Sequence, residues 1–322
     1  MTATRGTLRK SLSRTRSCRL WSLLAAAWLL CASPVFAEES IPAALIVPEA
    51  SGVAKKIYDD VVEGILADKR LDIDIITINK ETTASDLQPQ LEQLDVDMAL
   101  AIGNTSYKLC EQVKLDGTKI AGGISGAPNG IPTVSLTAHP RETFAELKRI
   151  APEIKQVRLV YNDSINGWWY RLAMAIAPEF NLVVHGYEAE DIKQGVKLFE
   201  RMLSGATPKE TAIWIPLRGI VPSKTILPLV LEKAWSKKLA VISNNPSHTK
   251  LGGLLALYPN HSGMGRQIAN FAVSQHRGQD KAVITGTHSV RTAINVRTSA
   301  HIGIRISSDD EQTFDRIYPV QR

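Results

Sequence analysis

Side chains that could contact a small ligand follow several short apolar runs of this 322-residue sequence. Each run is typical of a buried strand, and the polar residues come where the strand would end and a helix begin. In open parallel sheets, ligands bind beyond the carboxyl ends of the strands. Helix N-termini at that edge present free N–H groups and a partial positive charge, which suit a carboxylate. The candidate binding residues, polar or charged except for one aromatic, are Glu49, Ser51, Asn104, Thr105, Ser125, Asn162, Asp163, Trp168, Arg218 and Asn244. Ser, Thr, Asn and Asp are also ordinary helix caps, so capping is the alternative role for each of them.

The sequence lacks the residue spacings that catalytic and metal sites use. Its seven His residues are scattered without an H-E-x-x-H pair, and neither a G-x-S-x-G sequence nor a Walker loop occurs. The glycines of the stretch 121–126 follow a predicted strand but miss the G-x-G-x-x-G order of a dinucleotide site. Glu49 and Asp163 could converge as a carboxylate pair, although ligand recognition or capping is the commoner use of such residues. We therefore expect no enzyme activity, no cofactor and no metal.

Short apolar runs alternate with amphipathic stretches and predict the elements that hold these residues. In the first half of the chain, strands are predicted at 43–47, 73–78, 98–102, 119–124 and 131–136, with helices at 51–69, 85–94 and just after 103–106. In the second half, strands are predicted at 157–161, 181–185, 212–215, 240–243, 252–257 and 293–296, with helices at 168–177, 191–204, 223–237 and 262–276. Near-continuous apolar strands joined by helices are typical of parallel sheets covered on both faces. The sequence therefore predicts an α/β fold of two doubly wound parallel-sheet lobes.

The first 37 residues have the pattern of a cleaved signal peptide. Six basic residues without an acid are followed by an apolar run at 20–32 and by the small-residue end Val35-Phe36-Ala37. This run of 13 residues is shorter than the roughly 20 that a membrane-spanning helix needs. An uncleaved anchor is one alternative, and a lipoprotein modified at Cys31 is another, although Leu30 stands before Cys31 where a small residue is expected. We expect export to the periplasm by the general route.

Removing this segment changes the charge of the chain. All six excess positive charges lie within residues 1–37, and residues 38–322 carry 32 Lys and Arg against 32 Asp and Glu. Proteins that bind nucleic acid neutralise phosphates with clustered Lys and Arg. A mature chain with balanced charge therefore predicts no nucleic-acid partner, and no second apolar run is long enough to span a membrane.

Only one cysteine belongs to the mature chain. Cys18 and Cys31 lie in the predicted signal peptide, which leaves Cys110 without an internal disulfide partner. Cys110 falls on the apolar side of a predicted helix with Leu109 and Val113. Since free Cys packs as a small hydrophobe, we expect a buried, inert thiol rather than a reactive one.

The C-terminal third of the sequence is similar to a known family. The stretches that carry the similarity are AIWIP at 212–216, GGLLALYPN at 252–260, GMGRQIA at 263–269, Arg277-Gly278, and AINVRTSAHIGI at 293–304. Together they resemble the substrate-binding proteins of ABC transporters in the tryptophan/tyrosine-type family, which belongs to the periplasmic binding proteins of type I fold.

The resemblance implies a Venus-flytrap architecture, in which two lobes joined by crossing strands close over a ligand in the cleft. We expect a signal peptide at 1–37, an N-terminal lobe at 38–138 plus about 259–292, and a C-terminal lobe at 139–258 plus about 293–322. The chain is expected to cross from one lobe to the other near 135–139, 257–259 and 293–295. The implied partners are a small-molecule ligand and an ABC permease of the inner membrane, with the protein itself a monomer.

The sequence departs from the family in the loop after the strand at 212–215. Where relatives often have an acid after the proline equivalent to Pro216, this chain has Leu217-Arg218. An acid would suit the ammonium group of an amino acid, whereas the planar guanidinium of Arg218 suits a carboxylate; a solvated loop residue is the alternative. Trp168 or Trp169 could close over an apolar ligand, or both could pack as core.

Two functions fit these observations. The first is a periplasmic solute-binding protein that delivers an amino-acid-like or carboxylate-bearing solute to an ABC importer. The second is a periplasmic accessory protein that reports ligand occupancy to a membrane-bound sensor kinase or cyclase, because a fold by itself does not specify function.

Overall fold

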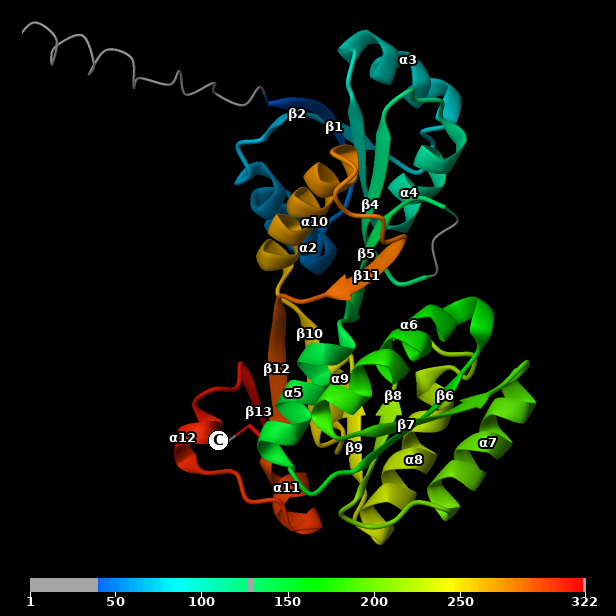
Figure 1. Ribbon diagram of the computed structural model, residues 1–322, viewed down its shortest axis with the longest axis vertical. Helices are drawn as coiled ribbons and strands as arrows, with labels where there is room; N and C mark the ends of the chain where they lie inside the picture. Colours follow the sequence, from blue (N-terminus) through cyan, green and yellow to red (C-terminus); the bar gives the residue numbers. More distant parts are fainter. Residues whose placement is uncertain (1–39, 127–129, 321–322) are drawn as a thin grey trace, which may run out of the picture. The chain divides into compact units, whose positions relative to one another are not determined.

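The computed structural model describes residues 40–126 and 130–320 (Figure 1). The signal peptide predicted at 1–37 lies outside the described residues. Two mainly parallel sheets, each flanked by helices, make up the described part of the chain. The prediction of two doubly wound α/β lobes is therefore confirmed.

The first sheet, which we call sheet A, consists of parallel strands only. Its spatial order is β11 (Ile284–Thr287), β5 (Thr133–Ala138), β4 (Thr118–Ile124), β3 (Met98–Ile102), β1 (Ile41–Pro48) and β2 (Leu71–Ile78). The first five strands of the chain thus follow the order 2-1-3-4-5 of a doubly wound sheet. Strand β3 is buried along its whole length because helices cover both faces, which explains its uninterrupted apolar sequence.

Helices cover both faces of sheet A. Helices α2 (Gly52–Leu66) and α10 (His261–His276) pack on one face, and α3 (Ala84–Leu94) and α4 (Gly103–Gln112) pack on the other. Gly64 of α2 and Gly265 of α10 let the backbones of these helices touch. A Cβ on Gly64 would lie 2.0 Å from the carbonyl oxygen of Ser262, and one on Gly265 would lie 2.1 Å from that of Val61, so no other residue fits at either place without moving a helix.

The second sheet, sheet B, repeats the arrangement. Its spatial order is β13 (Arg316–Tyr318), β12 (Val290–Asn295), β10 (Leu255–Pro259), β9 (Ala240–Ser243), β8 (Thr211–Ile215), β6 (Gln156–Tyr161) and β7 (Val183–Glu188). Strands β6 to β10 have the same relative order as β1 to β5. Only the pairing of β12 with β10 is antiparallel, so this sheet is parallel in its greater part.

Helices also cover both faces of sheet B. One face carries α5 (Pro140–Ile150), α6 (Asp163–Ile176) and the 3₁₀ turn η1 (Ala177–Phe180), and the other carries α7 (Ile192–Ser204) and α8 (Ser223–Lys237). The short helices are α9 (Pro246–Lys250), α11 (Val296–Ile302) and α12 (Ser308–Glu311). The core under α5 and α6 is aromatic: Trp214 of β8 meets Phe144 at 5.4 Å and Trp169 at 4.0 Å between ring centroids, both edge to face.

The chain passes between the two sheets at three places that contact one another. The passages lie between β5 and α5, between β10 and α10, and between β11 and β12. The amide N–H of His139 donates to the carbonyl of Thr287 at 2.8 Å, and that of Asn260 donates to the carbonyl of Ser289 at 2.9 Å. The third passage therefore falls at 288–289, a few residues before the approximate position expected from the sequence, because β12 pairs in sheet B from Val290 onward. The lobe boundaries at 138 and about 259 and 292 stay a proposal.

Two histidines stack at this junction. The rings of His139 and His288 lie 4.0 Å apart, and the carboxylate of Glu142 lies 2.8 Å from Nδ1 of His288. His139 is buried, and its Nδ1 accepts a hydrogen bond from the amide N–H of Arg141 at the start of α5. Burial, followed by the neighbouring His288, lowers the pKa of His139 to about 4. The junction is therefore built around a neutral His139 at pH 7.

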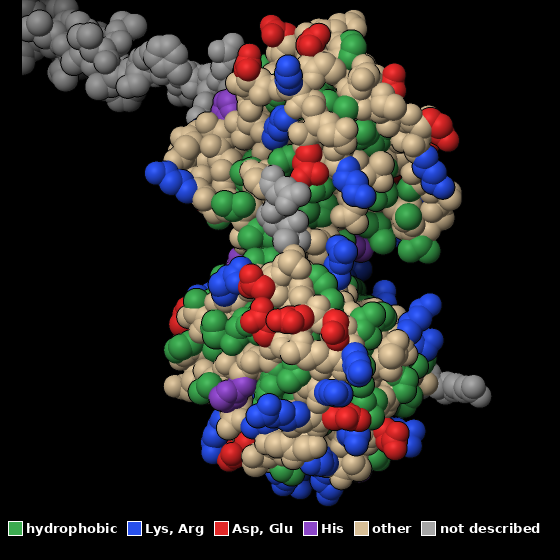
Figure 2. Space-filling view, turned by 90° about the vertical axis from the view of Figure 1, so that its right-hand side faces the viewer, with side chains coloured by type: hydrophobic (Ala, Val, Ile, Leu, Met, Phe, Trp, Pro, Cys, Tyr) green, Lys and Arg blue, Asp and Glu red, His purple; other side chains and the backbone are tan. Residues whose placement is uncertain are grey.

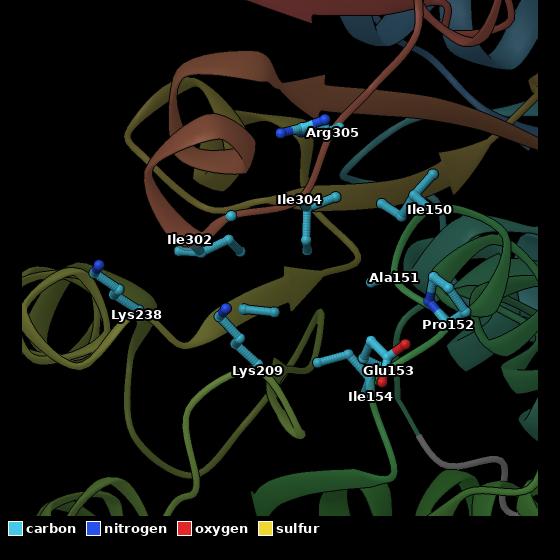
Figure 3. A pocket seen from close by; sticks show the side chains of 12 residues that line it. Ile150, Ala151, Pro152, Glu153, Ile154, Lys209, Lys238, Ile302, Ile304 and Arg305 are labelled. Atoms are coloured by element: carbon cyan, nitrogen blue, oxygen red, sulfur yellow. The ribbon is translucent and has the colours of Figure 1, made fainter.

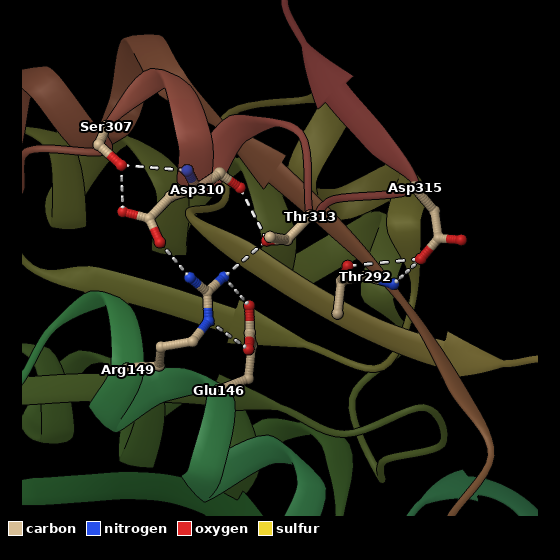
Figure 4. Close-up of polar contacts among 7 residues, drawn as sticks. All are labelled: Glu146, Arg149, Thr292, Ser307, Asp310, Thr313 and Asp315. Atoms are coloured by element: carbon tan, nitrogen blue, oxygen red, sulfur yellow. Dashed lines mark hydrogen bonds and ion pairs between the residues drawn. The ribbon is translucent and has the colours of Figure 1, made fainter.

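Arg149 of α5 binds the C-terminal segment at residues 310–314 (Figure 4). Its guanidinium donates to both carboxylate oxygens of Glu146, at 2.9 and 2.7 Å, and to Oδ1 of Asp310 at 2.5 Å. It also donates to Oγ1 of Thr313 at 3.1 Å and lies over the ring of Phe314. Because one planar group contacts two carboxylates and a ring, its orientation is fixed more firmly than in an ordinary surface pair.

Some element boundaries differ from the sequence-based predictions. The strand predicted at 252–257 begins at Leu255, since turns continue from α9 and Gly252 has a φ of +124°. Ser51 occupies the N-cap position of α2, but its side chain makes no capping hydrogen bond. In the ranges 40–126 and 130–320, no helix is both long and apolar enough to cross a bilayer.

Candidate ligand-binding site

A small pocket joins the carboxyl edges of the two sheets. From sheet A it is lined by Ser125, just after β4, and by Thr137 of β5; from sheet B it is lined by four residues of α6 and by the loop after β8. The lining residues of this interlobe pocket are Ser125, Thr137, Ile165, Asn166, Trp168, Trp169, Pro216, Leu217 and Arg218. Its volume is about 10 Å³, roughly the space of one water molecule. An organic ligand would therefore need its walls to separate.

The predicted site residues Ser125, Trp168 and Arg218 meet in this pocket, although they are 43 to 93 positions apart in the sequence. The topology brings them together because β4, β6 and β8 all end at the carboxyl edge of their sheets. The strand pattern of the sequence predicted this edge.

Arg218 is the charged residue of the interlobe pocket. Its side chain is exposed, and its guanidinium makes no hydrogen bond or ion pair with any described residue. A Cβ added to Gly126, in the loop after β4, would lie 3.2 Å from Nη1 of Arg218. Glycine thus leaves the guanidinium room beside the loop after β4. A planar guanidinium without a partner among the described residues is suited to bind a carboxylate in the interlobe pocket.

The loop of Arg218 is held by an asparagine that the sequence analysis missed. Asn166 is buried, and its Nδ2 donates to the carbonyl oxygen of Arg218 at 3.0 Å, while its Oδ1 accepts from the amide N–H of Asn162 at 2.9 Å. Its backbone interrupts α6 with non-helical angles of φ −143° and ψ 16°. The dipeptide Asn166-Gly167 is the feature of the sequence that could have predicted this interruption of the helix, because Asn-Gly is a frequent turn pair.

The predicted binding residue Asn162 has a structural use in this conformation. Its Nδ2 donates to the carbonyl of Ala189 at 2.9 Å, and its Oδ1 accepts from the hydroxyl of Ser164 at 2.6 Å. Asp163 is exposed and forms an ion pair with Arg171. Both side chains are engaged within the protein, and neither lines the interlobe pocket.

The two adjacent tryptophans have different surroundings. Trp169 is only 1% exposed, packs on Trp214 and donates from Nε1 to the carbonyl of Ala138 at 3.2 Å, so it belongs to the core. Trp168 is half-buried and has part of its surface on the pocket. Trp168 therefore stays the candidate for an apolar ligand contact.

Asn244 is a buried amide without partners. It is 2% exposed, and neither Oδ1 nor Nδ2 makes a hydrogen bond with any described residue. Strands β8 and β9 are in parallel register with Ile215 opposite Ser243, so Asn244 continues the edge beside Pro216 and the Arg218 loop. A buried polar group without a partner costs about 1–3 kcal/mol, and its retention calls for an explanation such as a bound water or ligand.

The remaining predicted residues lie at other strand ends of sheet A. Glu49 and Ser51 follow β1, and Asn104 and Thr105 open α4 after β3; all four side chains are exposed. None of them lines the interlobe pocket. Within the described ranges, no group of three or more His, Cys, Asp and Glu residues is placed to hold a metal ion.

Comparison with known proteins gives structural matches alone. No family model matches the sequence, and no curated protein matches it. Among solved structures, an ABC domain in complex with L-Trp from Streptococcus pneumonia matches with a TM-score of 0.51 and 16% identity, over 87% of this chain and 100% of that one. A ligand-free, open substrate-binding protein with adhesive properties from Clostridium difficile matches with a TM-score of 0.56 and 14% identity, over 86% of this chain and 98% of that one.

The chain has the fold of type I periplasmic binding proteins. At these identities the likeness extends to the fold alone, so function must be argued from the residues.

Proposed function

We propose that this protein is a periplasmic solute-binding protein of the tryptophan/tyrosine type, which captures a small carboxylate-bearing solute between its lobes and delivers it to an ABC importer. The observation that carries the proposal is the Arg218 guanidinium, which has no partner among the described residues, at a pocket to which both sheets contribute. The predicted signal peptide and the balanced charge of residues 38–322 agree with a periplasmic protein of this kind.

The residues of the interlobe pocket suggest separate roles in binding. Arg218 would hold the carboxylate through two parallel N–H donors. Trp168 would cover the apolar body of the solute, as aromatic side chains do in small-molecule sites. The amide of Asn244 lies beside the loop of Arg218 and does not line the pocket in this conformation; once the lobes separate, it would supply a donor and an acceptor to the polar groups of the solute. The side chain of Asn166 would act on the ligand only through the position of Arg218.

A change in the separation of the lobes would accompany binding. The interlobe pocket has a volume of about 10 Å³, whereas small-molecule sites commonly enclose ~300–1,000 Å³. The three passages between the sheets are the places where such a hinge motion would be absorbed. The lobes would then close on the solute and present its carboxylate to Arg218.

The experiment that tests the proposal combines native mass spectrometry with thermal shift. Protein purified from the periplasm without refolding is screened against amino acids, small carboxylates and nucleosides, because a ligand that binds only the folded state raises Tm. The variant Arg218→Gln is expected to bind the carboxylate ligand at least tenfold more weakly, since a hydrogen bond to a charged group is worth about 1.5–3 kcal/mol.

Arg201→Gln is the matched control, because Arg201 is an exposed arginine of α7 outside the interlobe pocket. It is expected to bind like the unmodified protein. Indifference of Tm to every carboxylate in the panel, or equal binding by the Arg218→Gln variant, would contradict the proposal. Capture of the ligand-bound form by a membrane kinase instead of a permease would support the sensory role.

A further inference from the structure

A larger cavity lies at the opposite edge of sheet B. Its walls come from the loops that precede strands β6, β8 and β9 and from the turn after α11, so it lies at the amino-terminal edge (Figure 3). We call it the amino-edge pocket. The five residues of β8, which span about 16 Å at ~3.3 Å per residue, separate this edge from the interlobe pocket. The two cavities therefore cannot share one small ligand.

The inner wall of the amino-edge pocket is apolar. Ile150, Ile154 and Ile302 belong to the buried core of the lobe, and Ile304 packs against that core while it lines the cavity. Figure 3 shows the side chain of Ile304 directed into the space between them. The cavity has a volume of about 220 Å³. An apolar protein cavity of ~150 Å³ stays dry and binds benzene, so this one has room for a ring and a short chain.

The rim of the same pocket is positively charged. Lys209, Lys238 and Arg305 line it against a single acid, Glu153. All four side chains are exposed, and none makes a hydrogen bond or ion pair with a described residue. Three unpaired cations beside one carboxylate favour a negatively charged group at the mouth. Lys and Arg side chains also gather at the lower end of the face drawn in Figure 2.

Two of these cations stand at positions with an unusual backbone conformation. Lys209 and Lys238 have φ values of +63° and +54°, a left-handed conformation for which Gly or Asn is the usual choice. Gly303, also left-handed with φ +85°, leaves space for the Lys209 side chain: a Cβ there would lie 3.7 Å from Cε and 3.9 Å from Nζ. The Lys209 ammonium is thus packed against the turn that forms one wall of the pocket.

We propose that the amino-edge pocket is a second binding site, which takes a small hydrophobic carboxylate. The apolar body of the ligand lies against the four isoleucines, and its carboxylate lies at the rim with Lys209, Lys238 and Arg305. The site is independent of the interlobe pocket, because no residue lines both.

The test uses 3-phenylpropionate as the probe and the isoleucine methyl NMR signals of the full mature chain as the readout. We expect the signals of Ile150, Ile154, Ile302 and Ile304 to shift, with a dissociation constant below about 1 mM. Ile165 lines the interlobe pocket, so its signal reports any binding of the probe there separately from binding at the amino-edge pocket. The neutral analogue 3-phenylpropanol should bind about tenfold more weakly, because it lacks the charge that the rim favours.

Two variants locate the site without relying on the spectra alone. Ile304→Trp fills the cavity and should abolish binding of the probe. The double variant Lys209→Gln/Arg305→Gln changes exposed side chains only, so folding is not at risk; it should weaken the carboxylate about tenfold and leave the alcohol unchanged. Equal affinity for acid and alcohol, shifts confined to Ile165, or no shift at millimolar probe would each overturn the proposal. A failure here leaves the Arg218 test unaffected, since that test reads the other pocket.

Discussion

Replacing Asn244 by leucine should stabilise the ligand-free protein and weaken ligand binding. In most buried positions the loss of an amide destabilises a protein, because the amide's hydrogen-bond partners are left unpaired. At Asn244 neither side-chain atom has a partner among the described residues, and the residue is 2% exposed. Leucine has the same branched arrangement of four side-chain heavy atoms and removes two buried polar atoms without leaving another group unpaired.

The size of the effect follows from the cost of an unpaired buried polar group. That cost is about 1–3 kcal/mol, so the free energy of unfolding of the ligand-free Asn244→Leu variant should rise by about the same amount. For a chain of this size 1 kcal/mol corresponds to roughly 2 °C in the midpoint. Calorimetry of ligand-free protein should therefore show Tm higher by about 2–6 °C. The ligand that protects the unmodified protein should bind the variant at least tenfold more weakly.

Asn295→Leu is the matched control, because Asn295 is also a buried amide, 6% exposed, and both of its polar side-chain atoms make hydrogen bonds. Its Nδ2 donates to the carbonyl of Thr249 at 2.9 Å, and its Oδ1 accepts from the amide N–H of Thr298 at 2.9 Å. Its replacement leaves both groups unpaired and should lower the stability by about 2–4 kcal/mol. If Asn244→Leu lowers Tm as Asn295→Leu does, then Asn244 has a structural role and the reasoning about a ligand-binding amide is refuted.

Three further predictions concern stability and reactivity. Arg149→Met should cost about 1 kcal/mol and speed amide hydrogen exchange in β13, since the pairing with Asp310 is lost; unchanged exchange would mean that the C-terminal segment is held by other contacts. Because burial and His288 lower the pKa of His139 to about 4, the unfolded chain takes up a proton first as pH falls below 6.5. The free energy of unfolding, measured by urea titration, should thus decline by up to about 3 kcal/mol between pH 6.5 and 4, and the decline should flatten in His139→Asn; an equal slope in both proteins would exclude His139 as its source. Burial raises the pKa of the Cys110 thiol to about 11, so a disulfide reagent at pH 8 should modify the mature chain only as it unfolds in urea, and rapid modification of the native protein would contradict this.

The sequence by itself determined the elements and the edge at which ligands are expected. Apolar runs without alternation indicated strands buried on both faces, and the structure has such strands in β3, β8 and β10. The repeated strand–helix order indicated two doubly wound lobes. Cys110 was expected to be buried and is. These properties depend on neighbouring residues and on the periods of strand and helix, both of which are local.

Only the tertiary structure decided which polar residues meet. Glu49 and Asn104 follow parallel strands as Ser125 and Arg218 do, yet only the latter two line the interlobe pocket. The difference arises from the three passages between the sheets, where residues as far apart in the sequence as His139 and Thr287 contact each other. No local pattern encodes which strand ends of one sheet come opposite those of the other.

Tertiary structure also decided whether a polar side chain is free to bind. Asn162 and Asn244 both follow a buried strand and read alike in the sequence, but the amide of Asn162 is used by Ala189 and Ser164 while that of Asn244 has no partner among the described residues. Hydrogen-bond satisfaction depends on groups brought close by folding rather than by sequence. The strand pattern therefore determined where the candidates lie, and the packing around each one determined whether it can bind, because a partner can come from any part of the folded chain.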